Sequence, residues 1–186
     1  MAPPATRPVS LSSYDILEIE MNDHVPLTVH LPDPPRLLAD AMLGKLARWL
    51  RLLGFDTRYA EGDNHRIAYL ARSGDRVLVT MDRRLARRRG LRTVLLTSQS
   101  LDTQIAQVVE VVGTPPPGAS PRCMACNAPL QSVSREAVRD RVPPYVARTH
   151  EVFNCCPKCG KIYWKGSHWR DIESNYPLVT RTLNRD

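Results

Sequence analysis

Long hydrophobic runs are missing from this sequence of 186 residues. Its apolar stretches are short and broken by arginine or lysine, so none approaches the roughly 20 residues that a membrane-spanning helix needs. Residues 1–8 also lack the apolar core of a secretory signal. We therefore expect a cytoplasmic protein without membrane contact, whose cysteines bind metal rather than form disulfides.

Acidic residues are also in the minority. The chain has 19 Asp and Glu against 26 Lys and Arg, which gives a formal net charge of +7. Nearly all the basic residues are arginine, whose planar guanidinium group suits phosphate oxygens. This excess favours a polyanionic partner such as RNA, although an arginine-rich genome would produce the same composition.

Cysteines are few, but four of the five form two Cys-x-x-Cys pairs, Cys123/Cys126 and Cys156/Cys159. Two residues between paired cysteines allow one tight turn to direct both sulfurs at one metal, and zinc prefers four such ligands in a tetrahedron. Gly160 supplies the permissive backbone that such a turn commonly needs. The sequence therefore predicts a structural Zn²⁺ site, because a redox dithiol of the thioredoxin type would need only one pair.

Three further residues are alternative zinc ligands. Cys155 could replace its neighbour Cys156, although the spacing argues against this, and we expect His150 and His168 at the surface or against RNA. The segment between the two pairs has too few apolar residues for a core of its own, so we expect the metal to hold it together.

The order of apolar segments predicts an α/β fold. Short apolar runs alternate with amphipathic segments from Arg36 onward, as a parallel sheet with crossover helices requires. Strands are expected over residues 36–39, 55–59, 76–80 and 93–97, and helices over 43–53, 64–72, 82–89 and 101–112. The expected divisions are an N-terminal extension with a small hairpin (1–35), the α/β domain (36–113), a proline-rich linker (114–121), a zinc ribbon (122–170) and a tail (171–186).

Two aspartates follow predicted strands, Asp40 after the first and Asp82 after the third. The carboxyl ends of parallel strands converge on one edge of a sheet. Either residue alone is equally a helix N-cap, but two carboxylates about 4 Å apart would repel by roughly 4 kcal/mol at an effective dielectric near 20, so the pair implies a cation. Magnesium suits such oxygens and can activate water for attack on a phosphodiester. Asp56, Asp63 and Asp102 are candidate additional ligands.

Two other families with acidic strand ends fit less well. A receiver domain needs an acidic pair after its first strand and a lysine after its last, and neither is present. A haloacid dehalogenase phosphatase needs Asp-x-Asp, whereas Ala41 and Met42 follow Asp40.

Three motifs together carry a family resemblance. They are Leu-Ala-Asp-Ala-Met-Leu-Gly-Lys-Leu-Ala-Arg-Trp-Leu-Arg-Leu-Leu-Gly-Phe-Asp-Thr over residues 38–57, Arg-Val-Leu-Val-Thr-Met-Asp-Arg-Arg-Leu over 76–85, and the paired cysteine motifs Cys-x-x-Cys-Asn and Cys-Pro-Lys-Cys-Gly-Lys-Ile-Tyr-Trp. Over about residues 36–170 the chain resembles the PIN-like ribonuclease domain found at the C-terminus of the Mut-seven exonucleases and as stand-alone prokaryotic proteins. The resemblance implies a PIN-type parallel-sheet sandwich with a fused zinc ribbon and a Mg²⁺ or Mn²⁺ site that cuts RNA.

The resemblance also implies roles for particular residues. The acidic positions of the family fall on Asp40 and Asp82, Thr80 of the Thr-x-Asp motif is expected to orient the site, and Asp56 matches a Gly-aromatic-Asp motif. Asn64 stands where the family usually has an acid, with Asp63 one position early, and Met81 stands where it often has arginine. Gln104 matches a further family position.

Our leading interpretation is a metal-dependent ribonuclease, with tRNA and ribosome-associated RNA among the candidate targets. Basic side chains on two helices are expected to follow the RNA phosphates, namely Lys45, Arg48 and Arg51 on the first and Arg83, Arg84 and Arg87 on the second. The alternative is a non-catalytic RNA- or ribosome-binding protein with a degenerate nuclease pocket. A toxin of a toxin–antitoxin pair is a third reading, although such toxins are usually shorter and lack a ribbon.

Overall fold

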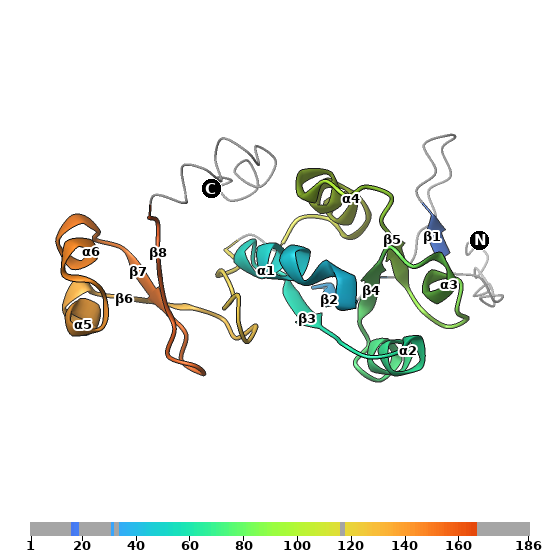
Figure 1. Ribbon diagram of the computed structural model, residues 1–186, viewed down its shortest axis with the longest axis horizontal. Helices are drawn as coiled ribbons and strands as arrows, with labels where there is room; N and C mark the ends of the chain where they lie inside the picture. Colours follow the sequence, from blue (N-terminus) through green and yellow to red (C-terminus); the bar gives the residue numbers. More distant parts are fainter. Residues whose placement is uncertain (1–15, 19–30, 32–33, 116–117, 167–186) are drawn as a thin grey trace, which may run out of the picture.

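The structure is a computed structural model that describes residues 16–18, 31, 34–115 and 118–166. It has a five-stranded parallel sheet in the order β1-β5-β4-β2-β3 and a three-stranded antiparallel sheet in the order β6-β7-β8 (Figure 1). The strands of the parallel sheet are β1 (Ile16–Glu18), β2 (Arg36–Ala39), β3 (Asp56–Tyr59), β4 (Val77–Thr80) and β5 (Thr93–Leu95). Its helices are α1 (Gly44–Leu52), α2 (Asn64–Ser73), α3 (Arg83–Ala86) and α4 (Leu101–Val112), with a 3₁₀ turn, η1 (Ala41–Leu43), before α1.

Two apolar layers enclose the parallel sheet, because successive side chains of a strand point to opposite faces. Leu37 and Val79 face α1 and α4, in a cluster that includes Trp49, whereas Leu38 and Leu78 face α2 and α3. Figure 1 shows helices on both sides of the sheet, with α4 above it and α2 below it. The predicted α/β fold with a parallel sheet is confirmed.

The predicted strands and helices differ from the observed ones by two residues or fewer at most of their ends, and by more at two places. The helix expected over residues 82–89 ends at Ala86, and beyond it the carbonyl groups of Arg89 and Gly90 accept hydrogen bonds from the Arg72 side chain. Part of the first predicted hairpin strand forms β1, which pairs in parallel with β5. The hairpin turn and most of its second strand lie outside the described residues.

The C-terminal unit has a small apolar core. Its elements are β6 (Gln131–Val133), α5 (Arg135–Val138), η2 (Arg139–Arg141), α6 (Pro144–Thr149), β7 (Phe153–Cys155) and β8 (Ile162–Trp164). Val138, Val142, Ala147 and Phe153 are buried together between the helices and the sheet. The sequence indicated too few apolar residues for such a core, so metal ligation is not the sole source of stability in this unit.

Pro115 and Ala119, in the segment predicted as a linker, lie close to Gly54 at the end of α1. Gly54 has a φ of +101°, which side chains rarely adopt, and a Cβ placed there would lie 3.3 Å from the Cβ of Ala119. Glycine therefore allows both the sharp turn after α1 and the close approach of the linker. Within the part of the chain that the structure describes, no helix combines the length and apolar character needed to cross a membrane.

Candidate functional site

The two aspartates that the sequence singles out lie at the carboxyl ends of neighbouring strands. Asp40 directly follows β2, and Asp82 lies two residues beyond β4, which pairs with β2. Thr80, the last residue of β4, is fully buried, and its hydroxyl group donates a hydrogen bond to Oδ2 of Asp40. The same hydroxyl oxygen accepts a hydrogen bond from the backbone N–H of Asp82, at 2.9 Å. Thr80 therefore joins the two aspartates, as a residue that orients the site would.

Asp40 is a buried carboxylate, with 3% of its surface exposed. Its Oδ1 accepts a hydrogen bond from the backbone N–H of Met42, at 3.1 Å. Burial raises the pKa of the Asp40 carboxyl above its ordinary value, the hydrogen bonds from Thr80 and Met42 oppose this, and the negative charge of Asp82 raises the pKa further. Holding Asp40 ionised is therefore costly unless a cation lies beside it.

Asp82 is held by the first turn of α3 and by Asn64. Its Oδ1 accepts hydrogen bonds from the backbone N–H groups of Arg84 and Leu85, at 2.7 and 3.1 Å, and so caps the helix. Its Oδ2 accepts a hydrogen bond from Nδ2 of Asn64, at 2.8 Å. The Asn64 hydrogen bond is the largest cause of the lowered pKa of Asp82, so this amide stabilises the ionised carboxylate without adding charge.

The other candidate acids do not join this pair closely. Asp63 caps α2 by accepting a hydrogen bond from the backbone N–H of Arg66, at 2.8 Å. Asp102 lies in the first turn of α4, where its Oδ1 is buried and has no hydrogen-bond partner among the described residues. Across residues 34–115 and 118–166, the four cysteines are the one group of three or more Asp, Glu, His or Cys whose ligand atoms all lie within 4.8 Å of one another.

Asp56 lies away from the carboxylate pair, which corrects the expected grouping. It begins β3 opposite Arg36 of β2, so it stands at the amino end of the sheet, whereas Asp40 follows the carboxyl end. Its carboxylate oxygens are 2.9 and 3.2 Å from the guanidinium nitrogens of Arg76. Burial raises the pKa of Asp56, but the hydrogen bonds from Arg76 and Asn127 outweigh it and bring the pKa below its ordinary value.

The carboxylate oxygens of Asp40 and Asp82 are of the kind that a hydrated magnesium or manganese ion binds. Two carboxylates at one edge are the donor set that Mg²⁺ commonly takes from a protein while it keeps several waters. A hollow of about 700 Å³ is lined by Met42 and Met81, which lie close to Asp40 and Asp82 in the sequence, although neither aspartate lines it. Its other lining residues are Leu43, Lys45, Leu46, Gln99, Ser100, Leu101 and Gln104. Gln104 fixes its rim, since Nε2 donates a hydrogen bond to the carbonyl oxygen of Ser98, at 2.8 Å.

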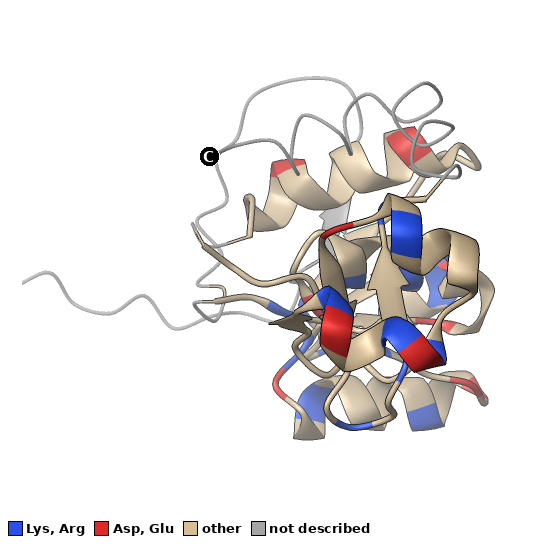
Figure 2. Cartoon of the chain, turned by 90° about the vertical axis from the view of Figure 1, so that its left-hand side faces the viewer, with Lys and Arg blue, Asp and Glu red and all other residues tan. Residues whose placement is uncertain are grey.

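Most of the predicted phosphate-binding side chains are exposed. These are Lys45, Arg48, Arg83, Arg84 and Arg87. Figure 2 shows basic segments on several elements, whereas α4, at the top, has acidic ones only, and its sequence contains neither Lys nor Arg. The contact of the five exposed basic side chains with RNA stays a prediction.

Arg51 is the exception, and the structure corrects its expected role. Its side chain is buried, with 7% exposed, and does not face solvent. Nε donates a hydrogen bond to the carbonyl oxygen of Thr57, at 2.8 Å, and Nη1 donates one to that of Met124, at 2.7 Å. Arg51 therefore connects α1 and β3 to the first cysteine turn and cannot follow phosphates.

We expect Arg51→Met to destabilise the protein by about 2–4 kcal/mol, because it leaves buried carbonyl groups without a donor. Denaturant unfolding followed by circular dichroism measures the change. The matched control is Arg48→Met, an exposed position on the same helix, which should cost less than about 0.5 kcal/mol. Equal effects of the two substitutions would show that the hydrogen bonds of Arg51 add no stability.

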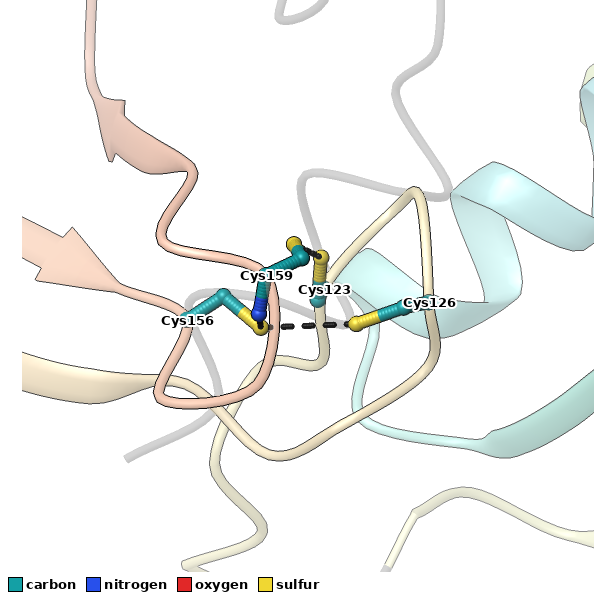
Figure 3. A group of neighbouring side chains, drawn as sticks. All are labelled: Cys123, Cys126, Cys156 and Cys159. Carbon is teal, nitrogen blue, oxygen red and sulfur yellow. Dashed lines mark hydrogen bonds between the residues drawn. The ribbon is translucent and has the colours of Figure 1, made fainter.

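The four paired cysteines direct their sulfur atoms at one point (Figure 3). The Sγ atoms of Cys123 and Cys159 are 3.6 Å apart, and those of Cys126 and Cys156 are 3.4 Å apart. A tetrahedral zinc ion with bonds of about 2.3 Å would separate its sulfurs by about 3.8 Å. The cysteines are therefore positioned to bind a metal ion.

The two cysteine turns have the same backbone geometry. Asn127 donates its N–H to the carbonyl oxygen of Cys123 at 2.8 Å, and Gly160 donates its N–H to that of Cys156 at 2.9 Å. Both residues have a left-handed φ, +66° and +70°. Their repeated conformation explains why asparagine or glycine follows each Cys-x-x-Cys pair.

Hydrogen bonds prepare Cys123 for metal binding. Burial raises its pKa, but hydrogen bonds from the Tyr163 hydroxyl and from backbone N–H groups outweigh this and lower the pKa to about 6. The alternative ligands lie elsewhere. The sulfur of Cys155 is near the carbonyl oxygens of Cys156 and Gly160, and Nδ1 of His150 is 2.8 Å from the Thr149 hydroxyl. His168 lies outside the described residues.

Asn127 is a residue whose role the sequence analysis missed. Its Oδ1 accepts a hydrogen bond from the backbone N–H of Thr57 at 3.1 Å, and its Nδ2 donates one to Oδ1 of Asp56 at 2.6 Å. The side chain of Asn127 therefore pairs with the edge strand β3, and Arg122 adds an ion pair to Asp56 at 3.9 Å. The available signal was the asparagine of the Cys-x-x-Cys-Asn motif, in a place where glycine is commoner.

Comparisons with known proteins give one family. The model of the family described as Mut7-C RNAse domain matches residues 35–176, which include both aspartates and all four metal-binding cysteines. Searches of curated proteins and of solved structures find no match. Because the family match covers more than half of the chain, the protein belongs to the Mut7-C RNAse domain family.

Proposed function

We propose that the protein is a ribonuclease that hydrolyses RNA phosphodiester bonds with Mg²⁺ or Mn²⁺ at Asp40 and Asp82. The observation that carries the proposal is the placement of Asp40 and Asp82 on neighbouring strand ends, where the Thr80 hydroxyl donates to the Asp40 carboxylate and accepts from the backbone N–H of Asp82. A divalent ion, when bound, neutralises charge on the phosphodiester and lowers the pKa of water. The raised pKa of Asp40 fits a group whose ionised form needs a cation nearby.

The residues around the pair have supporting roles. Thr80 holds Asp40 in one orientation, the first turn of α3 fixes Asp82, and the hollow lined by Met42, Met81 and Gln104 receives the strand. Exposed basic side chains on α1 and α3 would attract the phosphates from a distance. We also propose that the metal at the four cysteines is structural zinc, because four thiolates at these distances leave no open position for catalysis.

The second candidate function is RNA binding without cleavage. The observation in its favour is the hydrogen bond from Asn64 to Asp82, where an acid would have supplied another metal ligand. With two carboxylates instead of three, the ion would be held more weakly, so the pocket would bind RNA and leave it intact.

One assay separates the two functions. Purified protein is incubated with end-labelled single-stranded RNA, with Mg²⁺, with Mn²⁺ or without added divalent ion. Cleavage products that form only with Mg²⁺ or Mn²⁺ support the nuclease. Retained binding without products under all three conditions contradicts it and supports the RNA-binding alternative.

We expect Asn64→Asp to lower the Mn²⁺ concentration for half-maximal activity about tenfold, because a third carboxylate beside Asp82 strengthens ion binding. Without metal the same change removes the hydrogen-bond donor to Asp82 and places a second negative charge beside this carboxylate, so the melting temperature should fall. Cleavage rates and thermal unfolding are measured against Mn²⁺ concentration.

The matched control for that change is Asn154→Asp, which adds the same charge in β7 of the C-terminal unit. It should leave the Mn²⁺ response as in the unmodified protein. An Asn64→Asp protein with an unchanged Mn²⁺ response would place the ion elsewhere. Cleavage gained only in Asn64→Asp would favour the degenerate-pocket alternative.

A further inference from the structure

A second hollow, of about 370 Å³, lies where the edge strand β3 meets the first cysteine turn. We call it the junction pocket. Its lining consists of Arg51, Asp56, Arg58, Tyr59, Arg76, Arg122, Ala125, Cys126, Asn127, Ala128 and Lys158. Five of these residues are basic and one is acidic, whereas the hollow lined by Met42 and Gln104 has a single basic residue.

Two of the arginines in the junction pocket are committed to the structure. Arg76 is buried and holds the Asp56 carboxylate with two hydrogen bonds, at 2.9 and 3.2 Å. Arg51 is buried, and its charge lies near the thiols of Cys123 and Cys126, so it offsets the negative charge that these acquire as metal ligands.

The remaining positive charge is available to a ligand. Arg58 and Lys158 are exposed, and neither side chain has a hydrogen bond or an ion pair among the residues that the structure describes. Arg122, partly exposed, lies 3.9 Å from Asp56, whose charge Arg76 already neutralises. Since these charges have no counterpart in the pocket, an anionic ligand fits it.

The junction pocket is lined in part by Tyr59, the last residue of β3, which pairs with the strand that precedes Asp40. Strand β3 runs from Asp56 to Tyr59, about 10 Å at 3.3 Å per residue. The Tyr59 hydroxyl donates a hydrogen bond to the carbonyl oxygen of Ala41, the residue after Asp40, at 2.8 Å. Its ring is partly exposed, with 37% of the residue accessible, and can stack on a base.

We propose that the junction pocket binds phosphate groups of the same RNA strand that the carboxylate pair receives. Arg58 and Lys158 contact the phosphates, and Tyr59 stacks on a base between the pocket and the pair. The proposal rests on the proposed function for the identity of the strand. According to this proposal, the metal-binding unit forms part of the RNA-binding surface, because Lys158 lies inside the second cysteine turn.

The test is the salt dependence of RNA binding. Labelled single-stranded RNA is titrated with the full-length Asp82→Asn protein, alone and with Arg58→Ala and Lys158→Ala together. Binding should weaken about tenfold at low salt, and the slope of log affinity against log salt should fall by about 1.4, which corresponds to two phosphate contacts. The matched control combines Arg139→Ala and Arg148→Ala, two exposed arginines that do not line the pocket.

Each outcome decides the proposal. Unchanged RNA binding overturns the proposal, and so does an equal loss of slope in the control. An acidic peptide is titrated in parallel. If the Arg58 and Lys158 substitutions abolish binding of the peptide and leave RNA binding intact, the pocket binds a protein partner and the proposal is also overturned. If RNA binding depends on Arg58 and Lys158 but the unmodified protein does not cleave RNA, the proposed RNA-binding pocket is supported and the proposed hydrolytic function is contradicted.

Discussion

Replacing Asp40 by asparagine is expected to reduce metal-dependent RNA cleavage by about a thousandfold while leaving the metal-free fold at least as stable as before. The loss of cleavage follows from removing one of two ionic ligands at the strand ends. The retained stability follows from the burial of Asp40, because the asparagine Oδ1 can accept the hydrogen bond from Met42 and its Nδ2 can donate one to the Thr80 hydroxyl oxygen, without the cost of a buried charge.

The pH dependence of stability provides an independent measurement on the same variant. Since the pKa of Asp40 is raised in the folded protein, its contribution to metal-free stability is present below about pH 3.9, the ordinary aspartate value, and is lost as pH rises through the raised pKa. The difference in unfolding free energy between Asp40→Asn and the unmodified protein should therefore grow in favour of the variant with rising pH. Added Mn²⁺ should reverse this order.

The control is Asp75→Asn, because Asp75 is an exposed carboxylate that pairs with Arg36 and Arg92 at the other end of the sheet. Its cleavage rate should stay within about twofold of the unmodified protein. Undiminished cleavage by Asp40→Asn, in a preparation free of contaminating nuclease, would remove the carboxylate pair from the mechanism.

Periodic and local signals made most of the fold predictable. The strands β2 to β5 and the helices α1, α2 and α4 follow from apolar patterns and turn residues that are local in the sequence. Examples of such turn residues are Asp63 at the start of α2 and Gly113 after α4. The position of Asp40 and Asp82 at one edge follows from the parallel sheet itself. The paired cysteines are equally local, because each pair shares one turn.

Polar contacts between distant residues left no such signal. Arg51 lies on the basic stripe of α1 in the sequence, and only its contact with Met124, 73 positions away, shows that it is structural. Asp56 matched a motif, but its partners Arg76 and Asn127 lie at separations of 20 and 71 residues. In the sequence, a charged side chain that forms hydrogen bonds to a distant segment cannot be distinguished from one that faces solvent.

Removal of the metal from the four cysteines is expected to loosen β3 as well as the C-terminal unit. The first cysteine turn holds Asn127 in the conformation that pairs with Thr57, and it presents the Met124 carbonyl group to Arg51. Structural zinc contributes apparent binding free energies of about 10–16 kcal/mol in small modules, so its loss should open this turn. Hydrogen exchange should then lose protection in β3 and β7, whereas β4, in the middle of the sheet, stays protected.

Two adjacent cysteines give the matched pair of variants for this experiment. Cys156→Ser removes a sulfur of the cluster, and Cys155→Ser removes one outside it, so the first should lose the bound zinc while the second keeps one equivalent by metal analysis. Cys156→Ser should also melt at a lower temperature and reproduce the exchange pattern of the chelated protein. Unchanged protection of β3 after zinc loss would contradict the coupling, since it would show that the edge of the parallel sheet is stable without the turn. If the coupling holds, zinc acts on RNA cleavage indirectly, because β3 leads from the cysteine turn to Tyr59 and its hydrogen bond beside Asp40.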